Sequence, residues 1–145
     1  MIWINVPPNI EDYEGFVYCI TNLDNGKKYI GKKAFWSNIK LPPLKGRTKK
    51  EKERRAKLKG NKRHVKKESD WKDYYGSSKE LLLDVEKQGK NRFKREIKVL
   101  CKGKWEMAYF EAKMQFDNDV LLRDDYYNGI LNLRVCKAPK ELRLK

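Results

Sequence analysis

Two tyrosines lie eleven positions apart near the start of the chain, and each belongs to a short run of apolar residues. Tyr18 falls in the first run and Tyr29 in the second, with the turn-like sequence DNG between them. Lys32 and Lys33 follow the second run. Phenols close to a cation can pass protons, and lysine stabilises phosphate as a point charge. The pattern indicates either a site that handles phosphate or ordinary packing of strand tyrosines.

A single glutamate, Glu111, lies among apolar residues in a segment whose sequence is typical of a long helix. A charge on the apolar side of a helix costs free energy unless something pairs with it. One carboxylate can anchor a hard divalent cation when phosphate and water fill the other coordination positions. Glu111 is therefore either a metal ligand or a salt-bridged glutamate at the edge of its helix.

Hydrophobic periodicity predicts the elements that must position these residues. Asn25-Gly26 between the first two strands is typical of a type I′ hairpin turn. Ser77 and Glu80 form a capping box, and Gly89 ends the helix that follows. The predicted strands cover residues 16–22, 27–31 and 93–100, and the predicted helices cover residues 77–89 and 104–123. The second helix is expected to bury Trp105, Ala108, Tyr109, Ala112 and Phe116, and part of 126–135 could be a last strand.

The order of these elements predicts an α+β fold, in which helices flank a small three-stranded antiparallel sheet. The chain has 145 residues, and we predict a single domain over residues 1–145. Residues 41–68 offer almost nothing to bury, and we predict that they form a basic insertion outside the core. Residues 48–59 within it could be a surface helix. Whether the insertion orders without a polyanion is left open.

The formal net charge is +15, and most of it is local. Residues 45–67 carry thirteen Lys and Arg against two acids, which favours nucleic acid as the partner. The segment has no interleaved aromatics, so we expect it to contact phosphates rather than bases. The predicted DNA contacts are Lys32, Lys40, Arg47, Lys49, Lys50, Arg54, Arg55, Lys62 and Arg63.

Other classes of protein fit the sequence less well. No apolar run approaches the roughly 18 residues that span a bilayer, and acids at positions 11 and 12 break any signal peptide. We therefore expect a cytoplasmic protein. Cys19, Cys101 and Cys136 show no paired spacing, so free buried thiols are expected and a zinc site is not.

Several motifs follow one another in the order found in one known protein family. Phe16-Val17-Tyr18 stands where that family has Gly-Ile-Tyr, and Tyr29-Ile30-Gly31 matches Tyr-Ile-Gly outright. After these motifs come a helix that begins with Ser-Ser and then a strand. A helix with Tyr109-Phe110-Glu111 and the pair Tyr127-Asn128 complete the series. Over residues 15–132 the chain thus resembles the GIY-YIG nucleases, above all the catalytic domains of phage homing endonucleases.

The resemblance implies an endonuclease that hydrolyses phosphodiester bonds in DNA with Mg²⁺ or Mn²⁺, encoded by a phage or another mobile element and acting in the host cytoplasm. It makes Glu111 the metal ligand and places Tyr18 and Tyr29 in the active site. It also implies that Asn128 orients the site, with Asn132 as the alternative.

The chain departs from the family at one catalytic position. Where homing enzymes place an arginine, this sequence has Ile39, which cannot stabilise charge. We favour Lys33 as the replacement, and the alternatives are Lys32, Lys40 and Arg47. The family also often has His or Tyr before the second helix, a position that Tyr75 fills here, with Tyr74 and His64 as rivals.

Two other functions compete with the nuclease. A non-catalytic basic protein that binds nucleic acid explains the charge but not Glu111 or the ordered tyrosines. A membrane-surface protein would need bulky apolar residues beside the cations of an amphipathic helix. The oligomeric state, the DNA specificity and the choice between nick and double-strand break are not fixed by the sequence.

Overall fold

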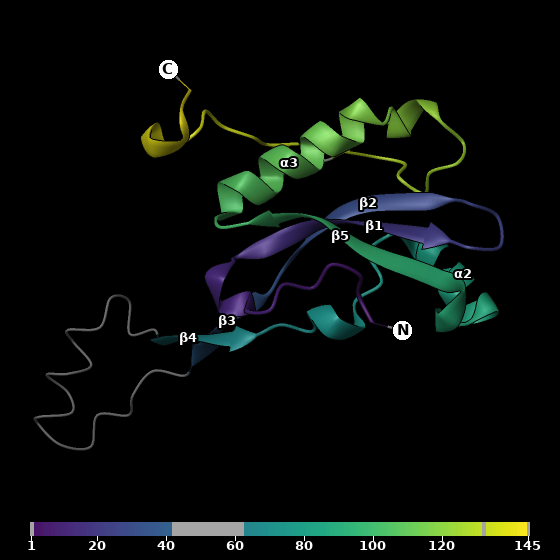
Figure 1. The fold of residues 1–145 in the computed structure, drawn as a ribbon, viewed down its shortest axis with the longest axis horizontal. Coiled ribbons are helices and arrows are strands. Elements are labelled where there is room, and N and C mark those ends of the chain that lie inside the picture. The colour runs from purple at the N-terminus through teal and green to yellow at the C-terminus, as the bar shows by residue number, and fades with distance from the viewer. Residues whose placement is uncertain (1, 42–62, 132, 145) are drawn as a thin grey trace, which may run out of the picture. The chain divides into compact units, whose positions relative to one another are not determined.

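The computed structural model describes residues 2–41, 63–131 and 133–144 (Figure 1). Its contacts divide the chain into two compact units. One unit comprises Met1–Phe35 and Asp70–Lys145, and the other comprises Trp36–Ser69. The second unit contains residues 41–68, for which the basic insertion was predicted.

A three-stranded antiparallel sheet forms the centre of the first unit, as predicted. Its strands are β1 (Gly15–Asn22), β2 (Lys28–Ala34) and β5 (Phe93–Cys101), in the order β2-β1-β5. Seven of the eight residues of β1 are buried, because this strand is central and both of its faces are covered. Tyr18 pairs with Gly31 across β1 and β2, which brings the two predicted motifs side by side.

Alternate residues of β1 enter two different cores. Val17 and Cys19 pack with Met107 of α3 (Lys104–Asp117), which covers one face of the sheet (Figure 1). On the other face, Phe16 contacts the rings of Trp3 and Trp71. The period-two pattern of the sequence therefore sorts an aliphatic core from an aromatic one.

The hairpin between β1 and β2 has a longer turn than predicted. Asn22 N–H donates to the carbonyl of Lys27, and Gly26 N–H donates to the carbonyl of Asn22, both at 2.8 Å. Among residues 22–28 only Gly26 has a positive φ, at 73°. A type I′ turn needs a positive φ at both central residues, so the predicted turn type was wrong.

The helix α2 (Lys79–Gln88) confirms the predicted helix but not its cap. Ser78, rather than Ser77, accepts a hydrogen bond from the N–H of Leu81. Gly89 ends the helix with a φ of 93°, as expected of a glycine at that position.

The helix α3 is shorter than predicted and buries a different stripe. It ends at Asp117, and Asp119 then adopts a left-handed conformation with a φ of 51°. Its buried residues are Met107, Ala112 and Gln115. The predicted stripe was wrong at Tyr109 and Phe116, which are exposed.

The segment after α3 forms no strand in its described residues, so the alternative of a last strand is not supported. Tyr126 makes one isolated bridge to Lys28. The N–H of Lys28 donates to the carbonyl of Asp125, and the N–H of Tyr127 donates to the carbonyl of Lys28. This segment therefore covers the outer edge of β2.

The second unit contains two strands that the sequence did not predict. β3 (Trp36–Leu41) pairs with β4 (Arg63–Glu68) in an antiparallel ladder. The Nζ of Lys66 lies 4.8 Å from the ring of Trp36. The helix predicted over residues 48–59 lies outside the described residues.

The remaining elements are short. The 3₁₀ helices are η1 (Ile10–Asp12), η3 (Trp71–Asp73), η4 (Lys90–Arg92), η5 (Val120–Leu122) and η6 (Lys140–Leu142). The three cysteines are free thiols, and Cys136 is exposed rather than buried. Within the described ranges, no helix has the length and apolar character needed to cross a membrane.

Candidate active site

A pocket of about 390 Å³ opens in the first unit, between β2, the start of α2, α3 and the segment after α3. It brings together three residues that the sequence singled out: Tyr29, Glu111 and Asn128. The other lining residues are Ser77, Ser78, Lys79, Gln115, Tyr127, Gly129, Ile130, Leu131 and Leu133. The pocket therefore combines hydroxyls, a carboxylate and an ammonium with an apolar rim.

Glu111 is the half-buried carboxylate of this pocket. It lies on α3 between Met107 and Gln115, one turn away on either side, and both of these are buried. Burial raises the pKa of Glu111, and the ammonium and main-chain N–H of Lys32 lower it in part. Across the described residues, no group of three or more His, Cys, Asp or Glu could hold a metal ion. An ion in this pocket would therefore take few ligands from protein carboxylates.

Tyr29 reaches the pocket from β2. Its hydroxyl lies 2.9 Å from the Oγ of Ser77. Burial raises the pKa of Tyr29, the hydrogen bond with Ser77 lowers it, and the charges of Tyr74 and Glu111 raise it. Glu111 is thus close enough to Tyr29 for the carboxylate to influence the ionisation of the phenol.

Tyr18 is 1% exposed and is not among the residues that line the pocket. Its ring centroid lies 6.2 Å from that of Tyr29 and 6.0 Å from that of Tyr74. A Cβ built on Gly31 would lie 2.5 Å from the Tyr18 hydroxyl, so the glycine of the Tyr-Ile-Gly motif makes room for this phenol. Burial, with smaller effects from Tyr74, Tyr29 and Glu111, raises the pKa of Tyr18 well above its ordinary value.

Asn128 uses its amide to hold the edge of β2. Its Oδ1 accepts from the N–H of Ile30 at 3.0 Å, and its Nδ2 donates to the carbonyl of Ile30 at 2.8 Å. The Nε2 of Gln115 donates to the same carbonyl at 3.1 Å. Asn128 therefore orients the strand that carries Tyr29. The alternative, Asn132, lies outside the described residues.

Lys33 lies beside Tyr74, which packs against Tyr18, and is not among the residues that line the pocket. Its Nζ is 2.6 Å from Asp70 and 4.3 Å from the centroid of the Tyr74 ring. Lys32 is the lysine whose charge lowers the pKa of Glu111. The two neighbouring lysines thus serve different parts of the site.

Of the two tyrosines before α2, the structure brings Tyr74 and not Tyr75 to the predicted site. Tyr75 is buried against Arg95, whose guanidinium carbon lies 4.1 Å from the ring centroid. Arg95 also donates to the carbonyl of Tyr74 at 2.9 Å. Tyr74 packs edge-on against Tyr18 instead.

The remaining predicted cations lie in the second unit or outside the described residues. Lys40 lies in β3, and Arg63 lies in β4 with His64, which was a rival for the position before α2. The other predicted contacts fall outside the described residues: Arg47, Lys49, Lys50, Arg54, Arg55 and Lys62.

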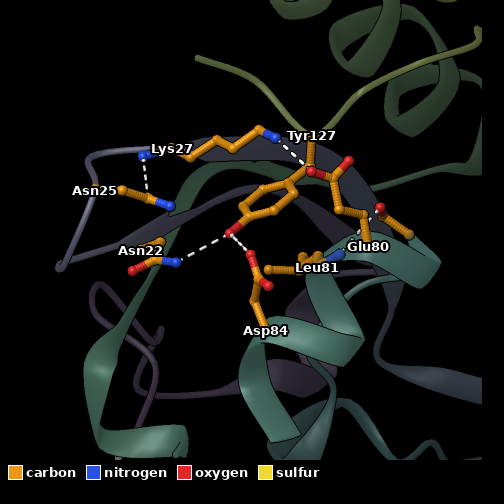
Figure 2. A network of polar contacts seen from close by, with 8 residues as sticks. Asn22, Asn25, Lys27, Glu80, Leu81, Asp84 and Tyr127 are labelled. Carbon is orange, nitrogen blue, oxygen red and sulfur yellow. Dashed lines mark hydrogen bonds and ion pairs between the residues drawn. The ribbon is translucent and has the colours of Figure 1, made fainter. Parts of the chain in front are cut away.

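A polar network that the sequence analysis missed surrounds Tyr127, which is one of the residues that line the pocket (Figure 2). The hydroxyl of Tyr127 accepts from the Nδ2 of Asn22 at 3.0 Å and donates to Asp84 at 2.7 Å. The Nζ of Lys27 lies 4.7 Å from the centre of the Tyr127 ring and pairs with Glu80. The network joins the hairpin turn, α2 and the residue next to Asn128.

A model of one protein family matches residues 5–131, which is most of the chain. Its description is "Putative endonuclease segE, GIY-YIG domain". The chain therefore belongs to the GIY-YIG nuclease family, in its segE-type branch, and the resemblance seen in the sequence motifs is confirmed. Searches of curated proteins and of solved structures found no match.

Proposed function

We propose that this protein is a metal-dependent endonuclease that hydrolyses phosphodiester bonds in DNA. One observation carries the proposal: a half-buried carboxylate, Glu111, shares a pocket with the phenol of Tyr29 in a chain of the GIY-YIG family. Phosphodiester hydrolysis needs an activated water and stabilisation of the charge that develops on phosphate. The pocket offers side chains for both tasks.

The donors of the pocket fit a hard divalent cation such as Mg²⁺ or Mn²⁺. Glu111 is an oxygen ligand whose burial disfavours its charge, and a bound cation offsets that penalty. Because Mg²⁺ keeps several waters and takes phosphate oxygens as ligands, one carboxylate is enough to anchor it. The bound ion supplies a Lewis acid next to the phosphate.

We propose that the phenols of Tyr18 and Tyr29 are neutral in the resting protein. Their pKa values are raised, so Tyr18 and Tyr29 hold their protons near neutral pH, where a neutral phenol can either donate or accept a hydrogen bond. Tyr29 lines the pocket and can contact a water or a phosphate oxygen there. Positive charge near Glu111 would lower the pKa of this phenol and favour its use as a proton acceptor.

Either of two lysines can stabilise the charge that forms on phosphate. Lys32 is supported by its electrostatic contact with Glu111. Lys33 is supported by its position against Tyr74, although Asp70 already neutralises it. We propose that Lys32 acts on the phosphate at the pocket and that Lys33 supports the Tyr18 side.

DNA is the partner that the charge distribution favours. The net charge of +15 resides mainly in residues 45–67, and we propose that this segment binds the phosphate backbone. If about five phosphates are neutralised, the log–log dependence of affinity on salt has a slope of about −4 to −5. We also propose a phage or mobile-element source and action in the host cytoplasm, as the resemblance of the sequence motifs to phage homing endonucleases implies.

The first test is cleavage of supercoiled plasmid DNA with Mg²⁺, with Mn²⁺ and with EDTA. We expect metal-dependent nicking or linearisation that falls by at least about 100-fold in Glu111→Gln, while DNA binding in a gel shift survives. The control is Asp117→Asn, an exposed carboxylate on the same helix that pairs with Lys113. Titration calorimetry with Mn²⁺ should show that Glu111→Gln alone loses binding.

The same assay separates the competing assignments. Lys32→Ala should lower cleavage more than Lys33→Ala if Lys32 acts at the pocket. DNA binding without cleavage in either metal would overturn the nuclease and support the non-catalytic binding protein. Cleavage that persists in Glu111→Gln would overturn the metal ligand alone.

A further inference from the structure

Two adjacent serines before α2 have different partners. The Oγ of Ser78 accepts from the N–H of Leu81 and caps the helix. The Oγ of Ser77 lies 2.9 Å from the hydroxyl of Tyr29, which belongs to another element 48 positions away in sequence. Because Ser78 already caps the helix, Ser77 is left to bind the phenol.

The backbone before α2 is shaped to approach Tyr29 closely. Gly76 has a φ of 90°, which side chains rarely tolerate. A Cβ built on Gly76 would lie 3.2 Å from two atoms of the Tyr29 ring. The glycine therefore lets the chain pass the ring at short range, and the next residue reaches the hydroxyl.

We propose that Ser77 is a positioning residue that fixes the Tyr29 hydroxyl in the pocket that contains Glu111. The inference rests on the proposed nuclease function and adds a residue to it. Ser77 acts through Tyr29, because its hydroxyl bonds the phenol.

The surroundings of Tyr29 explain why a neutral hydroxyl suits this role. Charged and titratable groups face it from several elements: Tyr18 on β1, Tyr74 before α2, Lys79 on α2, Glu111 on α3 and Tyr127 in the segment after α3. A hydroxyl can donate to the phenol oxygen or accept from it without adding charge to this crowded site. Ser77 can therefore keep its hydrogen bond to Tyr29 whether the phenol is protonated or ionised.

A double-mutant cycle tests the inference in single-turnover cleavage with Mg²⁺ and saturating DNA. Ser77→Ala should slow cleavage about fivefold to tenfold, the effect of one lost hydrogen bond. Ser77→Thr should restore most of the rate. In a Tyr29→Phe background, Ser77→Ala should have no further effect.

Ser78→Ala is the matched control, because it removes the helix cap and leaves the phenol contact in place. Its effect on the rate, whatever its size, should be the same in the Tyr29 and Tyr29→Phe backgrounds. An equal loss from Ser77→Ala in both backgrounds would mean that Ser77 only supports the helix, and the inference would be overturned.

A second readout does not depend on cleavage. In protein labelled with carbon-13 at the tyrosine Cζ, Tyr29→Phe identifies the Tyr29 resonance. That resonance should move in Ser77→Ala and keep its position in Ser77→Thr, and no movement in Ser77→Ala would overturn the contact. If the resonance moves but the wild-type protein does not cut DNA, the proposed function fails and the positioning role fails with it.

Discussion

The surroundings of Tyr29 and Tyr18 differ more than their similar places in the hairpin suggest. Tyr29 faces a pocket with a hydroxyl partner, a carboxylate and room for a ligand. Tyr18 is 1% exposed and lies among the rings of Trp3, Phe16 and Tyr74. Two phenols of the same motif pair therefore have different roles.

The difference arises from what covers each side chain. Gly31 lies under the Tyr18 ring and leaves no space for a ligand there. The chain before α2 approaches Tyr29 closely at Gly76 and Ser77, and Tyr29 also lines the pocket. Contact with substrate is thus expected of Tyr29, and support of the neighbouring rings is expected of Tyr18.

The largest expected effect separates the two phenols by activity. Tyr29→Phe should lower single-turnover cleavage by about 100-fold or more, because it removes a hydroxyl that contacts the reacting groups. Its free energy of unfolding should change by less than about 0.5 kcal/mol. Tyr18→Phe should show the reverse pattern, with a smaller loss of rate and a destabilisation of about 1–2 kcal/mol from the loss of its buried hydrogen bond with Tyr74. Equal rate losses in the two variants would break the comparison.

Local patterns were enough to predict the sheet, α2 and the special position of Glu111. The alternation in β1 and β5 and the glycine after α2 depend on near neighbours in sequence, so they are readable without the fold. Glu111 was conspicuous because its charge stands among apolar residues of α3. These features identified the family before any geometry was known.

Other features depend on contacts between distant residues. Tyr74 and Tyr75 are adjacent and alike in sequence, but Tyr75 packs against Arg95 and Tyr74 packs against Tyr18. Gln115 belongs to the buried stripe of α3, where aromatic residues were expected, because its amide donates a hydrogen bond to the carbonyl of Ile30. The strands β3 and β4 lie beside a lysine-rich segment with little to bury, so periodicity could not reveal them.

A smaller effect, on stability, is expected at Gly31, which packs against the Tyr18 hydroxyl. Gly31→Ala places a methyl group 2.5 Å from the Tyr18 hydroxyl, and the buried ring has no space into which it can move. We expect a destabilisation of about 1–3 kcal/mol in urea unfolding, as is usual for an overpacked core. Gly129→Ala is the control, since an added Cβ there meets nothing within 4 Å. If Gly31→Ala is as stable as Gly129→Ala, the Tyr18 side is less closely packed than described.

The smallest effect concerns Tyr127, whose network supports the pocket side of the comparison (Figure 2). Burial, and then the hydrogen bond with Asp84, raises the pKa of Tyr127 to about 12 from its ordinary value of 10.0. The folded protein thus holds this proton more tightly than the unfolded chain does. The resulting stabilisation is complete below pH 10 and is lost as the pH rises through 12.

Tyr127→Phe should therefore lower the free energy of unfolding by about 1 kcal/mol at pH 8, from the loss of its hydrogen bonds to Asn22 and Asp84. The gap between wild type and variant should narrow between pH 10 and pH 12, measured by urea unfolding at each pH. Asp84→Asn keeps the shape of the network and removes the charge that helps to raise the pKa of Tyr127, so in that background the narrowing should still begin near pH 10 but should end below pH 12. If the difference in free energy of unfolding between wild type and Tyr127→Phe stays constant to pH 12, the phenol stabilises the fold through packing alone. Packing does not change with pH, whereas the contribution of the bound proton does.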